Sequence, residues 1–142
     1  MSRRPRHSEE DFPVPGTVFV APMRDGRLSS GRVLRRQIEG GAQAALIAVS
    51  PWIGSELPSL DLPELRETLI LNHHHFRGHP ELVWVWDLMP ASFTIIGQIA
   101  LSSHDLAASS RTFASWESVP LQVLKQWRWH HDRDALLQEE EL

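Results

Sequence analysis

The alternation of apolar and polar residues near the start of the chain predicts a β-hairpin. Residues 17–21 and 27–34 both have strand-like patterns, and they flank a short polar segment that contains Asp25 and Gly26. Asp-Gly is typical of a tight turn, because glycine adopts positive φ without strain and aspartate hydrogen-bonds the turn backbone. This hairpin is the most informative feature of the sequence.

A third strand is predicted directly after the hairpin. The run 43–50 is almost wholly apolar and has the length of a strand, so we expect it at the centre of a sheet. Gly40 and Gly41 precede it and favour a turn between the second and third strands. We expect the segment 51–54, which begins with proline, to end this strand.

A short helix is predicted in the segment 59–72. Asp61 is suited to the N-cap, Pro63 to the first turn, and Glu64 and Glu67 to the positive end of the helix dipole. Leucines recur there at three- to four-residue spacing, which is typical of a helix with one buried face.

The second half of the chain predicts more strands than helices. We expect a central strand at 81–88, a strand at 93–101 with a bulge or close contact at Gly97, and a last strand at 119–130. A helical turn is expected over 104–110. The predicted fold class is therefore α+β, with a mostly antiparallel and strongly curved or SH3-like barrel-type sheet and one or two short helices.

The chain is expected to form one domain. Residues 1–14 are predicted to be a flexible tail, 15–130 a single globular domain, and 131–142 a short C-terminal helix or a frayed tail. No apolar run approaches the about 20 residues of a membrane span. The N-terminus lacks the apolar core of a secretory signal, and the chain contains no cysteine, so we expect a cytoplasmic protein.

The charge is unevenly distributed. The formal net charge is −4, but residues 1–36 carry eight arginines against four acids, and the remainder is strongly acidic. An acidic body argues against broad nucleic-acid binding, which needs a basic face, and favours a basic protein partner. The arginines of the hairpin region, Arg24, Arg27, Arg32, Arg35 and Arg36, are either the solvated face of a strand or a phosphate-binding set.

Histidines form the one dense cluster of ligand-type residues. On an extended chain His73 and His75 would point to the same side, and His79, Glu81 or His104 could supply a third metal ligand. The simpler interpretation is a solvated loop or a helix C-cap, and we expect neither a metal nor another cofactor. The sequence also lacks a nucleophile elbow, a P-loop and a dinucleotide fingerprint, so no catalytic residue is assigned and an enzyme is not expected.

An acidic set lies on or beside the predicted helix. Glu56, Asp61, Glu64 and Glu67 either serve the helix N-terminus or form a patch for a basic partner.

The hairpin resembles the opening of the Immunity protein 26 family, which comprises cytoplasmic antidotes of bacterial polymorphic and contact-dependent toxin systems. Leu28 and Ser30 replace aromatic residues of that family, and the Ile95-Ile96-Gly97 run is similar to a later strand of it. The resemblance is carried mainly by the following residues: Phe19, Pro22, Asp25, Gly26, Gly31 and Arg32.

This resemblance implies an inhibitor that binds a cognate toxin and occludes it, and that has no enzymatic activity. The residues that we assign to the toxin contact, on grounds of charge and chemistry, are Glu56, Asp61, Glu64, Glu67, Trp52 and Trp86. The alternative is an SH3-like or Tudor-like module that recognises peptide or RNA through the arginine-rich hairpin. The sequence does not specify the oligomeric state.

Overall fold

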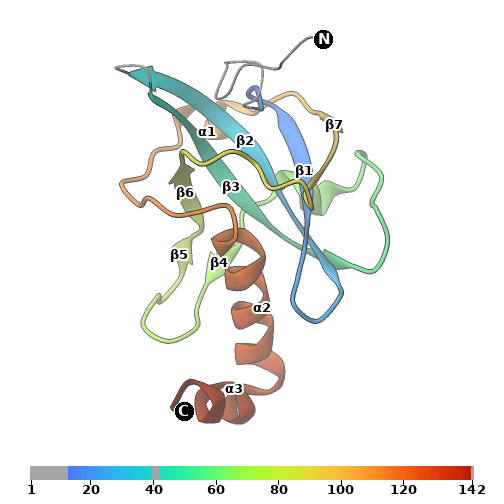
Figure 1. The fold of residues 1–142 in the computed structure, drawn as a ribbon, viewed down its shortest axis with the longest axis vertical. Coiled ribbons are helices and arrows are strands. Elements are labelled where there is room, and N and C mark those ends of the chain that lie inside the picture. The colour runs from blue at the N-terminus through green and yellow to red at the C-terminus, as the bar shows by residue number, and fades with distance from the viewer. Residues whose placement is uncertain (1–12, 40–41, 142) are drawn as a thin grey trace, which may run out of the picture.

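The protein is built on one twisted, mostly antiparallel sheet, which makes its fold class α+β (Figure 1). The computed structural model describes residues 13–39 and 42–141. Five strands lie in the order β6-β3-β2-β1-β7. Their bounds are Thr17–Pro22 (β1), Leu28–Glu39 (β2), Ala42–Gly54 (β3), Leu82–Val85 (β6) and Thr94–Gln98 (β7).

The remaining elements lie around this sheet. A separate two-stranded ladder pairs β4 with β5, and a 3-10 helix, η2, precedes it in the chain. Their bounds are Pro63–Arg66 (η2), Ile70–Leu71 (β4) and His79–Pro80 (β5). The three α-helices are α1 (Ser103–Ala107), α2 (Ser118–His131) and α3 (Arg133–Glu141). Within the described ranges no helix has the length and apolar composition needed to cross a membrane.

The predicted hairpin between β1 and β2 is confirmed. Gly26 has a φ of +91°, and its N–H donates to the carbonyl of Met23 at 3.0 Å. The Asp25 carboxylate accepts the backbone N–H of Arg27 at 3.0 Å. The turn predicted at Gly40 and Gly41 lies outside the described residues.

The expectation that residues 51–54 end the third strand is wrong. β3 continues to Gly54, which pairs with Leu28 of β2. The register between β2 and β3 shifts near this point, and the N–H of Trp52 donates to the hydroxyl of Ser50 at 3.0 Å. Proline is tolerated at such an irregularity because the ladder hydrogen bond it cannot donate is already interrupted.

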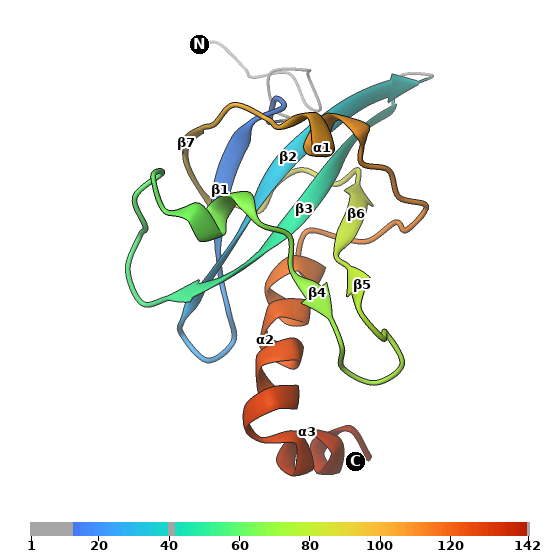
Figure 2. The ribbon, with the colours of Figure 1, turned by 180° about the vertical axis from the view of Figure 1, so that it is seen from behind.

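Alternate residues of β3 build two cores on opposite faces of the sheet. Ala45, Ile47 and Val49 belong to the core that contains residues of α2, which covers one face (Figure 1). Leu46 and Ala48 point to the other face, where η2 and α1 lie (Figure 2). Both faces are therefore covered, which explains the continuous apolar run of this strand.

The segment predicted as the last strand, 119–130, is a helix. Its buried residues Val119, Val123 and Gln126 follow helical spacing and pack one side of α2 on the sheet. The apolar residues of this segment also alternate over its first positions, so the local pattern fits both periods. Helix α2 has 14 residues, which exceeds the usual length of a strand and suits a helix.

Two further expectations need correction. The strand predicted at 81–88 shortens to β6 and lies at the edge of the sheet, not at its centre. Its outer side is covered, because the N–H of Trp84 donates to the carbonyl of Thr112 at 2.8 Å. The helix predicted in 59–72 is only η2, with Leu62 at its N-cap and no side-chain cap from Asp61.

The predicted irregularity at Gly97 and the helical turn in 104–110 are confirmed. β7 is bulged against β1, and Gly97 has a φ of +151°. A Cβ there would lie 2.3 Å from Cδ1 of Leu60, so the glycine permits close contact with the loop before η2. Among the described strands β6 and β7 do not pair, so the sheet is open.

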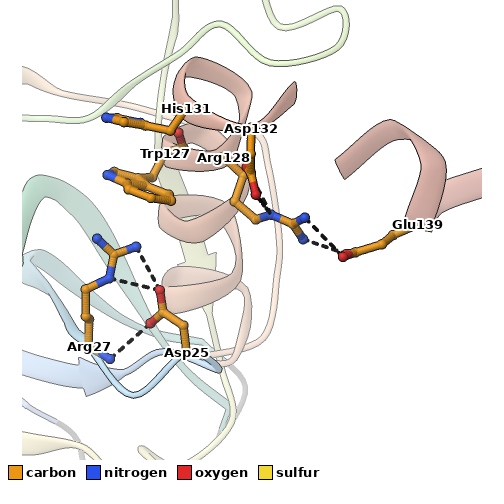
Figure 3. A network of polar contacts seen from close by, with 7 residues as sticks. All are labelled: Asp25, Arg27, Trp127, Arg128, His131, Asp132 and Glu139. Carbon is orange, nitrogen blue, oxygen red and sulfur yellow. Dashed lines mark hydrogen bonds and ion pairs between the residues drawn. The ribbon is translucent and has the colours of Figure 1, made fainter. Parts of the chain in front are cut away.

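The structure describes part of each predicted terminal segment. Pro13 is buried and Val14 is exposed, while the rest of the predicted tail lies outside the described residues. At the other end α3 forms, buries Leu136 and turns back on α2. The Arg128 guanidinium binds the Glu139 carboxylate at 2.6 Å and holds the two helices together (Figure 3).

A buried ion pair joins the sheet to the segments on its second face. The Arg32 guanidinium of β2 is 1% exposed and binds both carboxylate oxygens of Asp105 in α1, at 2.7 and 3.3 Å. It also donates to the carbonyl of Glu67 at 2.7 Å and to the hydroxyl of Thr68 at 3.1 Å. Burial opposes the ionised form of Asp105, but the hydrogen bonds and charge of Arg32 outweigh it and lower the pKa of this carboxyl.

We predict that Arg32→Ala lowers the free energy of unfolding by about 3–5 kcal/mol, because it leaves the Asp105 carboxylate buried without its partner. Urea unfolding followed by circular dichroism measures the change. Arg35→Ala is the matched control. Arg35 donates to the carbonyls of Leu106 and Ala108 from a more exposed position, so its loss is expected to cost about 1 kcal/mol.

The double variant Arg32→Met with Asp105→Leu tests the cause of this loss. It removes both charges, so it is expected to recover at least half of the stability that Arg32→Ala loses. Equal losses for the Arg32→Ala and Arg35→Ala variants would contradict the prediction.

Candidate binding surface

An open, shallow acidic pocket lies at one end of β3, between the sheet and the loop that leads to η2. Its volume is about 550 Å³. We call it the acidic pocket, and it is lined by Trp52, Gly54, Glu56, Pro58, Ser59, Asp61, Leu62 and Pro63. Its walls combine an indole, prolines and leucine with two carboxylates. Such a mixture of apolar surface and charge is suited to the stem and head of a lysine or arginine side chain.

The carboxylates of the acidic pocket are exposed and have no ion-pair partner among the described residues. Glu56 and Asp61 line the pocket, and Glu64 is exposed close by on η2. The segment 55–64 contains these three acids and no basic residue. Arg66 lies close to this segment and donates to the carbonyl of Leu60, but three carboxylates against one guanidinium leave this part of the surface with net negative charge.

The loop around the acidic pocket is held by several internal contacts. The Ser50 hydroxyl donates to the carbonyl of Glu64 at 2.9 Å, and the Arg66 guanidinium donates to the carbonyl of Leu60 at 2.7 Å. Leu65 is 1% exposed and packs against Val18 and Val20 of β1. The loop is thus fixed to the sheet in spite of having little regular secondary structure.

The Trp52 side chain forms the floor of the acidic pocket instead of projecting from it. Only 7% of this residue is exposed, so its assignment as an exposed anchor is corrected. Its ring lies over Gly54, where a Cβ would be 2.3 Å from Cζ2. The absence of a side chain at Gly54 makes room for the indole.

Three of the six residues assigned to the toxin contact, Trp52, Glu56 and Asp61, line the acidic pocket. Glu64 is exposed on η2, next to the pocket residue Pro63, and the other two lie elsewhere. Glu67 is exposed but lines a different cavity, which it shares with Arg32.

Trp86 lies toward the other end of β3, in a pocket of about 260 Å³. Its ring is 57% exposed and stands 5.1 Å from that of Phe113, which is 56% exposed. The sequence analysis did not select Phe113. The spacing of residues along the chain did not indicate that Phe113 would lie near Trp86. The segment around Phe113 reaches Trp86 through its backbone pairing with Trp84.

The arginines of the hairpin region are mostly engaged in internal contacts. Arg32 is buried against Asp105, and Arg35 donates to two carbonyls at α1. Arg27 binds the Asp25 carboxylate at 2.7 Å and lies 4.1 Å from the centre of the Trp127 ring (Figure 3). Arg24 is exposed, and Arg36 donates to Gln43. Most of these arginines therefore stabilise the fold through internal contacts.

The stacking in Figure 3 also explains the position of α2. The Trp127 ring lies between the Arg27 guanidinium and the imidazole of His131, whose centroid is 4.1 Å away at an interplanar angle of 10°. A hydrogen bond of 2.7 Å joins Nδ1 of His131 to the carbonyl of Trp127. The hairpin turn and the C-terminal half of α2 are therefore in direct contact.

The histidine cluster does not adopt the extended geometry on which the metal hypothesis depended. His74 and Arg77 have φ values of 54° and 50°, so the segment turns. His73 is buried against His74, while His75 and His79 are exposed and stack on Phe76. Within residues 13–39 and 42–141, no three His, Asp or Glu side chains are arranged to hold a metal ion.

Burial changes the ionisation of two residues near this segment. It lowers the pKa of His73, and the neighbouring His74 adds to this effect. Burial alone raises the pKa of Glu81 to about 7. No described residue forms a hydrogen bond or ion pair with the Glu81 carboxylate, which is why the neutral acid is favoured there.

Comparison with family models, with curated proteins and with solved structures finds no match for this chain.

We predict that stability falls as the pH rises through about 7 because of Glu81. Its folded-state pKa lies above the ordinary value of 4.5, so between these values the folded protein binds this proton more tightly than the unfolded chain does. The contribution is complete below about pH 4.5 and is lost above about pH 7, with a magnitude of up to about 3 kcal/mol. Urea unfolding at intervals from pH 5 to 8 measures it.

Glu81→Gln is expected to remove this pH dependence, because the amide does not titrate. The difference between wild type and variant isolates Glu81 from the opposite contribution of His73, which gains stability as the pH rises. Glu117→Gln, at an exposed position, is the control and is expected to follow the wild type. A Glu81→Gln profile parallel to that of the wild type would contradict the prediction.

Proposed function

We propose that this chain is a cytoplasmic immunity protein that neutralises a basic cognate toxin by binding and covering it. The observation that carries the proposal is the acidic pocket, where Glu56 and Asp61 are exposed on a loop fixed to the sheet, with Glu64 exposed next to it on η2. None of the three has an ion-pair partner among the described residues. The resemblance of the β1–β2 hairpin to the Immunity protein 26 family supports the same function.

The physical basis of such inhibition is binding and not turnover. Unneutralised carboxylates raise the rate at which a basic partner associates, and they disfavour acidic partners. A loop that is already held by Ser50, Arg66 and Leu65 loses little conformational freedom when it binds. A tight complex also needs an interface of about 1,600 Å², so we expect contacts beyond the acidic pocket.

The residues that carry the resemblance have clear structural roles in this chain. A Cβ at Gly31 would lie 2.7 Å from Cζ of Phe19, so glycine allows this phenylalanine to cross the adjacent strand. Arg32 forms the buried ion pair, and Asp25 with Gly26 makes the turn. These contacts stabilise the fold. The surface that binds the partner can therefore differ between proteins that share the motif.

We also propose that the sheet belongs to the SH3-like class in an open form. Its last strand, β7, lies beside its first strand, β1, and a meander leads from β1 through β3 to β6. This is the strand order of an SH3-like barrel that is not closed between β6 and β7.

The alternative function, recognition of peptide or RNA through the arginine-rich hairpin, has less support. Arg27, Arg32 and Arg35 already bind a carboxylate, a ring or backbone carbonyls. Filter binding with single-stranded RNA across a salt series tests this alternative directly. Binding that weakens steeply as salt increases would favour it over the toxin inhibitor.

We predict that neutralising the acidic pocket weakens inhibition of the toxin. The variant carries Glu56→Gln, Asp61→Asn and Glu64→Gln, and the probe is the toxin encoded by the gene adjacent to that of this chain. Its association rate at low salt is expected to fall about tenfold, because electrostatic attraction is lost. Surface plasmon resonance measures the rate, and survival on co-expression measures protection.

The matched control neutralises three exposed acids away from the acidic pocket, by Asp87→Asn, Asp134→Asn and Glu141→Gln. It changes the net charge equally, so its association rate is expected to stay within about twofold of the wild type. If the wild-type chain neither binds the toxin of the adjacent gene nor protects cells from it, the proposed function is wrong.

A further inference from the structure

The two edges of the five-stranded sheet differ in how they are protected. At β6 the outer edge is covered, since the N–H of Trp84 and the carbonyl of Trp84 both pair with the segment 112–114. At β7 the described residues pair only with β1, and no described strand pairs with its other edge. An open edge presents unpaired N–H and C=O groups, which form a template for another strand.

The sequence of β7 lacks the usual devices that prevent pairing at an edge. The run 93–101 contains no charged residue and no proline, and the side chain of Ile95 is 55% exposed. Natural edge strands are commonly protected by lysine, proline or inward-pointing charges. The bulge at Gly97 is the one such device present in β7.

Strand β7 contacts the loop that carries the acidic pocket. Leu60, from the loop that forms this pocket, packs against Gly97. Ile96 and Ile99 contact the same cluster as Trp52 and Leu65. The two views of the fold agree that the loop and β7 are neighbours (Figures 1 and 2). A strand added at β7 would therefore lie next to the loop that carries Glu56 and Asp61.

We propose that the β7 edge is where the partner binds, by adding an extended segment rich in lysine and arginine to the sheet. Backbone hydrogen bonds with β7 would supply register, and basic side chains on one side of the added strand would meet the acidic pocket. The inference names how the proposed toxin is recognised and rests on that proposed function.

A second copy of this chain is a poorer occupant of the same edge. Antiparallel pairing of β7 with itself would bring two copies of the segment 55–64 close together, each with three acids and no base. The whole chain also carries a formal net charge of −4. Repulsion between like charges thus favours a basic partner over a homodimer.

The test uses the full chain and synthetic peptides of about ten residues that alternate valine with lysine or arginine. Titration is followed by backbone amide NMR and by amide hydrogen exchange. We expect shifts and increased protection at residues 94–98, with a dissociation constant that rises at least about tenfold from low to high salt. An acidic peptide with glutamate at each basic position is expected not to bind.

Two modifications separate strand addition from charge attraction alone. N-methylation of alternate peptide amides removes the hydrogen bonds to β7, so the basic peptide is expected to bind at least about tenfold more weakly. Ile95→Lys places a positive charge on the edge and is expected to weaken binding similarly. Leu106→Lys is the matched control, because Leu106 is 61% exposed on α1 and the substitution is expected to leave binding unchanged.

Three results would overturn the inference. The first is equal binding of the methylated and unmethylated peptides. The second is a change in the amide NMR signals of the acidic pocket on addition of the basic peptide, with no change at residues 94–98. The third is concentration-dependent self-association that protects residues 94–98 without peptide. None of these affects protection from the toxin on co-expression, so a failure here is distinguishable from a failure of the proposed function.

Discussion

The buried ion pair between Arg32 and Asp105 is the interaction on which the second face of the sheet depends. The apolar residues of this face form two separate clusters, one around Trp52 and one around Trp84. Arg32 projects from β2 on the same face and binds both the segment at Glu67 and the helix α1. A charge with so little exposure is tolerated only because its donors meet a carboxylate, a carbonyl and a hydroxyl.

This arrangement links the architecture to the proposed binding surface. The hydrogen bond from Arg32 to the carbonyl of Glu67 holds the chain directly after η2, and Ser50 holds the carbonyl of Glu64 within it. The acidic loop is thereby attached to β2 and β3 at one end and contacts Gly97 of β7 through Leu60. Negative charge is displayed on a segment whose own conformation is set by buried contacts, a combination that under the proposed function favours fast and tight binding of a basic partner.

The comparison of prediction and structure shows where local pattern is sufficient. The β1–β2 hairpin, the apolar β3 and the irregularity at Gly97 were predictable because turn chemistry and apolar runs act locally. α2 was mistaken for a strand because its first apolar residues fit both periods. The extended geometry that the less favoured metal hypothesis required is absent, because His74 and Arg77 adopt positive φ values that nothing local in the sequence indicates.

The sequence by itself determined the α+β class, the hairpin, the acidic character of the segment 55–64 and the absence of cysteine chemistry, since these follow from composition and from neighbours in the chain. Only the tertiary structure decided that Arg32 meets Asp105, that Trp86 meets Phe113 away from the acids, and that the acidic loop contacts β7. These contacts join residues far apart in sequence, and they form only once whole elements have packed their apolar faces together.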